Sequence, residues 1–204
     1  MELEWKGERV ELYHDGGYRE VVLARPDRHN ALDELMRDEL VLSLRSLLLD
    51  PDAGAVGFIG RGPSFCSGGD LAGFGATRDP AEGHLVRTAR HLPWLVWQLA
   101  DRLVTGVHGA CIGAGLELAA FSGWVIAGLD TRFRLPEVQM GLLPGSGGTV
   151  SVPRRAGRQR SLWLMITGET IDAETALEWG LVDELVGVTE VADRVRMVAR
   201  ELLV

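Results

Sequence analysis

The sequence predicts one domain of the α/β class, with helices gathered towards its C-terminal end. Short apolar runs recur along the chain, and apolar residues recur at helical spacing in the stretches between them. Glycine-rich turns connect several of these runs to the helical segment that follows. Strands that alternate with helices in this way are typical of α/β proteins. The segments share no fixed sequence period, which excludes a repeat protein of the solenoid kind.

Each element follows from its own local pattern, in chain order. The turn sequence His14–Gly17 joins two strand-like runs and predicts a hairpin. Asn30 is the expected N-cap of the long helix that follows, and Pro136 opens a short helix. The expected strands span 10–13, 18–23, 55–59, 104–108, 124–127 and 132–135. The expected helices span 31–49, 80–99, 116–121, 149–156, 159–166, 173–179 and 190–203.

The composition is that of an ordinary globular protein. Hydrophobic residues make up 46% of the 204 residues and charged residues 25%, with a formal net charge of -8. No run of Lys and Arg forms a basic stripe, which argues against nucleic acid as a partner.

Other features argue against a membrane, a metal site and a secretory route. Cys66 and Cys111 are isolated and form neither a disulfide framework nor a metal-binding pattern. No apolar run is long enough to span a bilayer, and the charged stretch 1–10 contains no secretory signal. We therefore expect a cytoplasmic protein that contacts no membrane.

Two glycine-rich loops present backbone N–H groups. The loops Gly62–Leu71 and His108–Glu117 each follow a buried strand and precede helical structure. Glycine permits close approach of the backbone to a ligand, and helix N-termini carry unpaired N–H groups. Two such loops can supply two donors to one developing oxyanion. Tight packing alone explains them equally well, and neither loop matches a dinucleotide or P-loop fingerprint.

At these loops the sequence resembles the crotonase superfamily, also called the enoyl-CoA hydratase/isomerase family. Segments that resemble family motifs occur in order along nearly the whole chain: 25–32, 65–71, 109–117, 135–149, 167–169 and 180–184. The resemblance implies a crotonase-like spiral of ββα turns with a coenzyme A (CoA) site and an oxyanion hole. It places the spiral core at 1–156 and a helical part, shorter than usual, at 157–204.

By position in the motifs, the Gly69 N–H is the first oxyanion donor and the Ala114 N–H is the second. The family usually has glycine where this chain has Ala114. Alanine still donates its N–H but tolerates positive φ poorly, so we expect an ordinary helical dihedral there. The residues that the resemblance places near CoA are Arg28, His29, Ala31, Ser67, Gly69, Asp70 and Leu71. A solvated loop arginine is an equal alternative for Arg28.

The resemblance also supplies two catalytic carboxylates, Glu117 and Glu137. Hydration of an enoyl thioester needs water activated for attack at Cβ and a proton delivered to Cα, which two carboxylates can share. We assign Glu117 to activate the water and Glu137 to donate the proton. Both residues stand near expected helix starts, where the dipole alone stabilises an acid.

Several other residues receive structural interpretations. Asp70 is expected to cap the helix after the first loop. His108 is expected to be structural, and Cys66 and Cys111 to be small buried hydrophobes. Trp94 and Trp97 are expected to pack in the core, with an acyl-pocket role as the alternative.

The leading functional prediction is an enoyl-CoA hydratase of fatty-acid metabolism, with an acyl-CoA thioester as substrate and no cofactor or metal. The resemblance implies a homo-oligomer, a trimer or hexamer. The short C-terminal part and Gly123, where many members carry Asp, depart from the family pattern. The alternatives are another enolate reaction (isomerisation, decarboxylation or thioester hydrolysis), secondary metabolism on a CoA or carrier thioester, or a binding protein that has lost catalysis.

Overall fold

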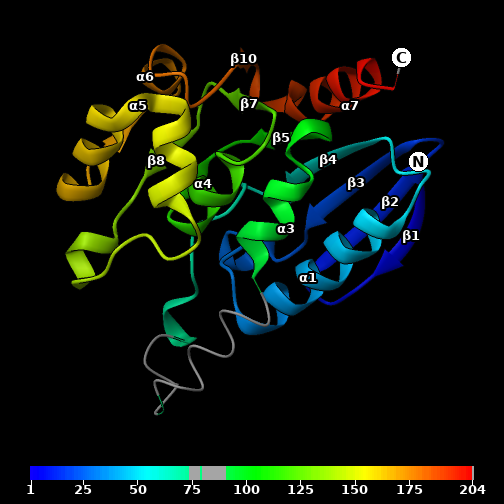
Figure 1. Ribbon diagram of the computed structural model, residues 1–204, viewed down its shortest axis with the longest axis horizontal. Coiled ribbons are helices and arrows are strands. Elements are labelled where there is room, and N and C mark those ends of the chain that lie inside the picture. Colours follow the sequence, from blue (N-terminus) through cyan, green and yellow to red (C-terminus); the bar gives the residue numbers. More distant parts are fainter. Residues whose placement is uncertain (74–78, 80–90, 204) are drawn as a thin grey trace.

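A seven-stranded sheet forms the centre of the computed structural model (Figure 1), which describes residues 1–73, 79 and 91–203. Its strand order is β1-β2-β3-β4-β5-β7-β10. The strands are β1 (Glu2–Lys6), β2 (Val10–Asp15), β3 (Tyr18–Leu23), β4 (Ala55–Gly60), β5 (Leu103–Val107), β7 (Trp124–Gly128) and β10 (Glu184–Val186). The predicted α/β class and the predicted strands of this sheet are confirmed.

The N-terminal strands pair antiparallel, and all later pairs of this sheet are parallel. Asp15 pairs with Tyr18, so Gly16 and Gly17 alone make the hairpin turn, with Gly16 at φ +57°. A two-residue turn of this kind requires positive φ, which glycine adopts without strain. β1 was not predicted; its residues are exposed throughout, and its apolar residues, Leu3 and Trp5, alternate with charged ones.

A second ladder runs beside the first and gives the chain its spiral path. Its three-stranded sheet contains β6 (Ala110–Ile112), β8 (Arg132–Arg134) and β9 (Thr170–Ile171) in that order. Two isolated parallel bridges, Cys66–Cys111 and Leu32–Gly69, extend this ladder to earlier parts of the chain. The chain therefore returns to the second ladder after β3, β4, β5 and β7. Each return is followed by helical structure, and this repetition is a ββα spiral.

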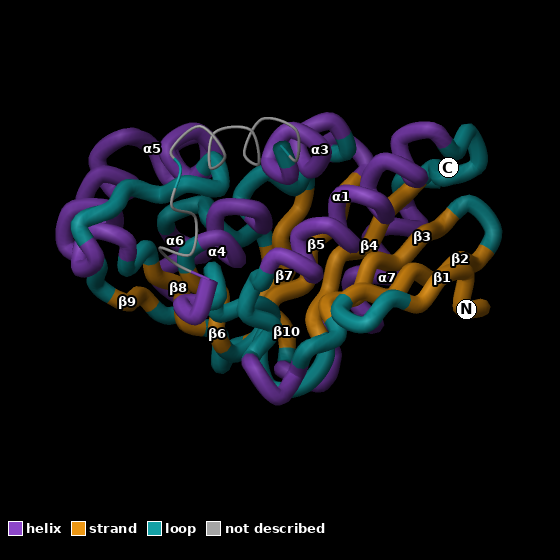
Figure 2. The backbone as a smooth tube through the Cα atoms, turned by 90° about the horizontal axis from the view of Figure 1, so that it is seen from below, coloured by secondary structure: helices purple, strands orange, loops and turns teal. Residues whose placement is uncertain are grey.

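Helices cover both faces of the large sheet (Figure 2). The helices in the described residues are α1 (Glu34–Leu49), α3 (Leu92–Gln98), α4 (Ala114–Ala119), α5 (Gly148–Thr167), α6 (Ala173–Glu178) and α7 (Val191–Glu201), of which α1 and α7 pack on opposite faces of the large sheet. Alternate residues of β4 point to different cores: Val56 and Phe58 join the cluster under α1, and Ala55 and Ile59 join the cluster under α7. This alternation is the period of two that a strand imposes.

The prediction that Asn30 caps the first long helix is wrong. The helix begins at Glu34, and the side chain of Asp33 accepts the Met36 N–H as its N-cap. Asn30 is fully buried with φ +53° and connects three chain segments instead. Its side chain accepts the Arg25 N–H and donates to the carbonyls of Arg61 and Ser64. Asparagine tolerates the left-handed region better than most residues.

The C-terminal third is helical, as predicted. The expected helices 149–156 and 159–166 form one element, α5, with a kink at Gly157, where φ is +78° and ψ is 164°. The helix predicted over 80–99 is confirmed only for α3, because 80–90 lie outside the described residues. The division of the domain after residue 156 stays a prediction. Within the described ranges, no helix has both the length and the apolar character needed to cross a membrane.

Candidate active site

Glu117 lies in the first turn of α4 and is buried, with 1% of its surface exposed. Its Oε2 accepts two backbone N–H groups, from Ser146 and from Gly148, each over 2.7 Å. Gly148 is the first residue of α5, so the carboxylate connects the starts of two helices. A Cβ at Gly148 would lie 2.6 Å from Glu117 Cγ, which explains why this close approach requires glycine.

Glu137 reaches the same region from the other side. It begins the 3-10 helix η4 (Glu137–Met140), directly after Pro136, and is half-buried. Its carboxylate lies against the N-terminus of α4, since a Cβ at Gly113 would be 3.0 Å from Glu137 Oε1. The other oxygen, Oε2, is buried and has no hydrogen-bond partner in the described part of the chain. A buried carboxylate oxygen without a partner is rare and marks a candidate ligand position.

The two carboxyl groups influence each other's protonation. The pKa of Glu117 is raised to about 7: burial raises it most and the neighbouring Glu137 also raises it, whereas the N–H groups of Gly148 and Ser146 lower it. Burial also raises the pKa of Glu137 above its ordinary value. Two adjacent carboxyl groups cannot both ionise easily, so the pair retains a proton near neutral pH. One acid and one base are thus available at the same place.

The two glycine loops touch each other beside these carboxyl groups. Cys66 N–H donates to the Ala110 carbonyl (3.0 Å), and Ile112 N–H donates to the Cys66 carbonyl (3.0 Å). Gly68 has φ +98°, and a Cβ there would lie 3.1 Å from the Ile112 carbonyl oxygen and 3.8 Å from Ala114 N. The turn that carries Gly69 therefore lies against the start of α4.

The expected dihedral of Ala114 is confirmed. Ala114 is the first residue of α4, and it is not among the non-glycine residues with positive φ. Gly113 takes the unusual conformation instead, with φ +51° and ψ -122°. Neither the Gly69 N–H nor the Ala114 N–H donates to a partner among the described residues. Their convergence on one oxyanion stays a prediction.

The segment predicted to contact CoA lies beside the first glycine loop. Ser67 N–H donates to the His29 carbonyl (3.0 Å), and His29 Nδ1 lies 2.9 Å from Ser64 Oγ. His29 adopts φ +49° at the end of the 3-10 helix η1 (Pro26–Arg28). Arg28 is exposed and Ala31 is half-buried. The structure therefore brings these predicted contacts onto one stretch of surface.

Asp70 and Leu71 lie at the far end of that loop. Asp70 Oδ1 accepts the Ala72 N–H (3.0 Å), which confirms its predicted capping role, here at the 3-10 helix η2 (Leu71–Gly73). Asp70 also pairs with Arg25 Nη1 over 2.6 Å, and this contact lowers the pKa of the Asp70 carboxyl group. Leu71 is 67% exposed, a large fraction for a leucine.

The prediction that Trp94 and Trp97 pack in the core is wrong. They are 50% and 41% exposed and stack on each other on the outer face of α3, with ring centroids 4.8 Å apart. Leu92, Leu95 and Val96 take the inner face of this helix. Cys66 and Cys111 are buried as expected, and burial raises the pKa of both thiols. His108 is half-buried just after β5.

Sequence reasoning missed the residues that hold the Glu117 carboxylate. The segment 135–149 resembles a family motif, but no role was predicted for its glycine-rich turn at 144–148, whose Ser146 and Gly148 N–H groups supply both hydrogen bonds. Gly147, at φ +91°, permits that turn. The signal was the glycine pattern itself, which marks exposed N–H groups before a helix. In the described residues, no group of three or more His, Cys, Asp or Glu side chains is arranged to hold a metal ion.

The chain is similar in sequence to enzymes that act on CoA thioesters. A family model for enoyl-CoA hydratase/isomerase matches residues 15–204. The chain is 32% identical to the 1,2-epoxyphenylacetyl-CoA isomerase of Escherichia coli K12 over 190 residues, which is 91% of this chain and 72% of that protein. It is also 32% identical to the 2,3-dehydroadipyl-CoA hydratase of the same organism, with 81% of this chain and 64% of that protein covered.

Solved structures match along almost the whole chain. A Mycobacterium abscessus protein described as an enoyl-CoA hydratase/isomerase superposes with a TM-score of 0.88 at 35% identity. The match covers 95% of this chain and 76% of that one. The crotonase-like spiral is therefore the fold of this chain.

Proposed function

The chain belongs to the enoyl-CoA hydratase/isomerase family, and from that premise we propose that it adds water across the double bond of a 2-enoyl-CoA thioester. The observation that carries this proposal is the pair formed by Glu117 and Glu137. Both carboxyl groups have raised pKa values, and they interact with each other. Hydration needs an acid and a base together, whereas a shift of the double bond can proceed with one carboxyl group.

In the proposed reaction, the thioester carbonyl oxygen accepts the N–H groups of Gly69 and Ala114. Glu117 takes a proton from water as the water oxygen bonds to Cβ. The electron pair of the double bond moves through Cα to the carbonyl oxygen and forms an enolate. Glu137 then delivers a proton to Cα as the carbonyl re-forms. Donors aimed at the enolate oxygen stabilise the charge where it develops.

The fixed orientation of Glu117 supports its part in this scheme. Its Oε2 is occupied by two backbone N–H groups, which leaves Oε1 for a water molecule. The same two bonds favour the ionised form, which a general base must reach during turnover. The partnerless Oε2 of Glu137 supports the role of a group that transfers a proton to substrate.

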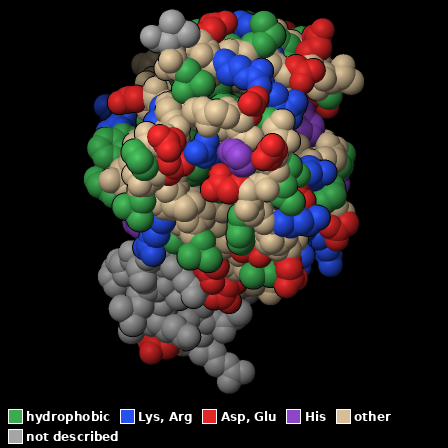
Figure 3. Space-filling model, turned by 90° about the vertical axis from the view of Figure 1, so that its right-hand side faces the viewer, with side chains coloured by type: hydrophobic (Ala, Val, Ile, Leu, Met, Phe, Trp, Pro, Cys, Tyr) green, Lys and Arg blue, Asp and Glu red, His purple; other side chains and the backbone are tan. Residues whose placement is uncertain are grey.

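We propose an acyl-CoA thioester as the substrate, with no prosthetic group in the reaction. The CoA part would lie along Arg28, His29, Ala31, Ser67, Asp70 and Leu71, which the fold brings to one surface. Nucleic acid is a poor candidate partner, because the net charge is -8. On the face shown in Figure 3, acidic and basic side chains are interspersed.

An isomerase is the second candidate, favoured by the 32% identity to a 1,2-epoxyphenylacetyl-CoA isomerase. The hydratase among the relatives has the same identity. Identity therefore does not separate the two reactions, and the paired carboxyl groups are the reason to prefer hydration.

We also propose that the chain forms a homo-oligomer. Val150, Leu162 and Ile166 of α5 are 46%, 51% and 61% exposed, and burial against a second copy would remove this apolar surface from water. Light scattering on a sizing column should then give a mass that is a multiple of 22.2 kDa.

The direct test of the reaction is incubation with a panel of 2-enoyl-CoA and 3-enoyl-CoA thioesters, analysed by mass spectrometry. A hydratase adds the mass of one water to the 2-enoyl substrate. An isomerase leaves the mass unchanged and moves the double bond. Binding of the thioesters without any conversion would contradict both candidates and favour a binding protein that has kept the fold.

A further inference from the structure

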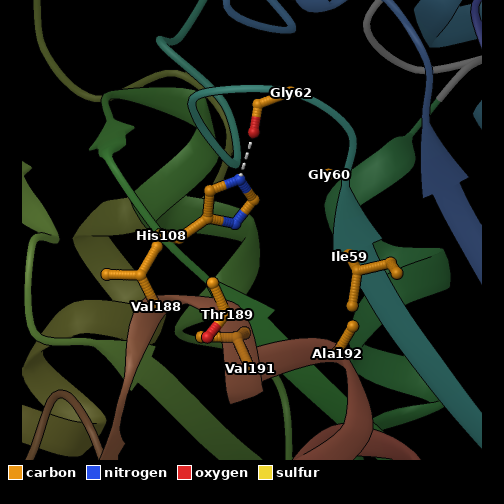
Figure 4. Close-up of a pocket in the computed structure, with 8 residues that line it drawn as sticks. All are labelled: Ile59, Gly60, Gly62, His108, Val188, Thr189, Val191 and Ala192. Atoms are coloured by element: carbon orange, nitrogen blue, oxygen red, sulfur yellow. Dashed lines mark hydrogen bonds between the residues drawn. The ribbon is translucent and has the colours of Figure 1, made fainter.

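A cavity of about 170 Å³ lies beside the first glycine loop, and neither Glu117 nor Glu137 lines it (Figure 4). Its lining comes from the end of β4, the first glycine loop, the residue after β5, the 3-10 helix η5 (Val188–Glu190) and the start of α7, and includes Ile59, Gly62, His108, Thr189, Val191 and Ala192. β4 and β5 are parallel neighbours, so the cavity opens at their carboxyl ends. In open α/β sheets, this edge is where ligands bind.

The cavity combines an apolar wall with two polar groups. Ile59 and Val191 are buried and form the wall. His108 Nε2–H donates to the Gly62 carbonyl oxygen over 2.8 Å, and since a carbonyl only accepts, this bond fixes the tautomer of the neutral ring. Nδ1 is then an acceptor, and Figure 4 shows it on the side of the ring that faces Thr189 and Ile59. Across the described ranges, neither Nδ1 nor the Thr189 hydroxyl has a hydrogen-bond partner.

We propose that this cavity is a second ligand site, which takes a small neutral molecule with a hydrogen-bond-donating head and a short aliphatic tail, such as a primary amide or an alcohol. The head donates to His108 Nδ1 and exchanges a hydrogen bond with the Thr189 hydroxyl, and the tail lies on Ile59 and Val191.

The surrounding charge selects a neutral head over an anionic one. Asp130 Oδ1 accepts the N–H of Gly109, the residue next to His108, over 3.2 Å. Glu190, beside Thr189, accepts the Gly187 N–H through Oε2 (2.9 Å). Both acids neighbour the cavity without lining it, so their negative charge and the lone pair of His108 Nδ1 disfavour a carboxylate ligand.

The volume limits the size of the ligand and its affinity. A cavity of about 150 Å³ is known to hold a benzene ring. A ligand with about six non-hydrogen atoms therefore fits, and for that size we expect a Kd on the order of 1–10 mM.

The site is connected to the loops of the proposed active site. His108 contacts the first loop twice, through the bond from its ring to Gly62 and through its carbonyl, which accepts the Phe65 N–H (2.8 Å). A ligand at Nδ1 therefore touches the residue where the two loops meet. Binding here does not depend on the proposed reaction, and it is measured without turnover.

The experiment is a titration of the ¹⁵N-labelled full chain with butyramide, followed by amide chemical shifts. We expect saturable shifts at Gly60, Gly62, His108 and Ala192, with butyrate at least tenfold weaker. Ala192→Phe fills the cavity and should abolish the shifts, whereas Ala192→Ser keeps the space and should retain them. Thr189→Val, which changes neither volume nor fold, should weaken binding severalfold.

The proposal is overturned if the shifts do not saturate by about 100 mM, a limit well above the expected Kd. It is also overturned if they map elsewhere, if butyrate binds as well as butyramide, or if Ala192→Phe binds like the wild type. If Ala192→Phe does not fold, unchanged affinity in Thr189→Val contradicts the proposed contacts.

Discussion

The carboxylate of Glu117 accepts the backbone N–H of Gly148, the first residue of α5, over 2.7 Å. Ser146 N–H donates to the same oxygen over an equal distance. A buried carboxylate with two such donors keeps one oxygen fixed and presents the other to a ligand. Because the proposed hydration needs an acid and a base beside the thioester, this contact makes Glu117 the first residue to test.

Glu117→Gln should reduce turnover of a 2-enoyl-CoA by about 10²–10⁴-fold, the range typical of a lost general acid or base. The Gln carbonyl can still accept both N–H groups, so the fold and the thioester Kd should change little. Steady-state kinetics and equilibrium binding check this. Glu178→Gln is the matched control, because the Glu178 side chain is 74% exposed on α6. Near-normal turnover in Glu117→Gln would remove this residue from the mechanism.

The stability of the protein should depend on pH through the same group. The pKa of Glu117 rises from an ordinary 4.5 to about 7, so between these values the folded protein binds more protons than the unfolded chain. The free energy of unfolding therefore falls as the pH rises through 7. Relative to Glu117→Gln, we expect a decline on the order of 3 kcal/mol between pH 4.5 and 8.

Urea unfolding of both proteins across that range measures the difference. Subtracting the two curves removes the contribution of carboxyl groups with lowered pKa, such as Asp50 and Asp70, which act in the opposite direction. A difference that is flat or that increases with pH would contradict the raised pKa.

Glu39 should be important for stability, although it lies outside the proposed site. Its buried carboxylate accepts the backbone N–H groups of Glu8 (2.9 Å), Arg9 (2.8 Å) and Val10 (2.9 Å), which holds the connection between β1 and β2 on α1. Glu39→Ala leaves these donors without their acceptor and should cost about 2–3 kcal/mol of unfolding free energy. Glu39→Gln, which keeps one acceptor oxygen, should cost less. Equal stability of all three proteins in urea would contradict this account.

Arg196 should anchor α7 to the sheet. Its guanidinium donates to both carboxylate oxygens of Glu20, over 2.8 and 2.9 Å, and the Glu20 side chain is only 2% exposed. Arg196→Ala leaves a buried charge without its partner and should cost about 3 kcal/mol. Arg200→Ala is the matched control, since the Arg200–Asp15 pair is half exposed and such pairs contribute about 0–1 kcal/mol. Chemical denaturation should show a larger loss of unfolding free energy in Arg196→Ala than in Arg200→Ala.

Local patterns were sufficient to predict most elements of the fold. The hairpin at Gly16 and Gly17 and the buried strand β4 follow from turn chemistry and apolar runs, which are properties of adjacent residues. β1 was not predicted this way, because it has no apolar run: Leu3 and Trp5 alternate with charged residues, all its residues are exposed, and it pairs with β2 alone. The N-cap was misassigned for a related reason: Asn30 makes contacts with Arg61 and Ser64 that no local pattern encodes.

Local sequence patterns also failed to predict the long-range contacts of the candidate site. The resemblance identified Glu117 and Glu137, and the fold places both at the N-terminus of α4. The contacts from Ser146 and Gly148 to Glu117 span about thirty residues of sequence, so only the folded chain reveals them. Trp94 and Trp97 were misplaced because apolar character alone does not say which face of a short helix is covered.

The central claim is that the Gly69 and Ala114 N–H groups stabilise an enolate, whatever reaction follows. Exchange of the Cα hydrogens of a saturated acyl-CoA in D₂O reports enolate formation alone. Ala114→Pro is the sharpest variant: Ala114 is the first residue of α4, where proline fits a helix, and the substitution replaces the N–H with the ring Cδ. Ala114→Gly, which keeps the N–H, is its control.

Mass spectrometry of the recovered thioester should show deuterium at Cα with the wild type and with Ala114→Gly. In Ala114→Pro the exchange rate at saturating thioester should fall by at least about 10²–10³-fold, because the donor is lost and the ring Cδ stands in its place. Exchange by folded Ala114→Pro at the wild-type rate would contradict the oxyanion assignment, as would a wild type that binds the thioester and exchanges nothing.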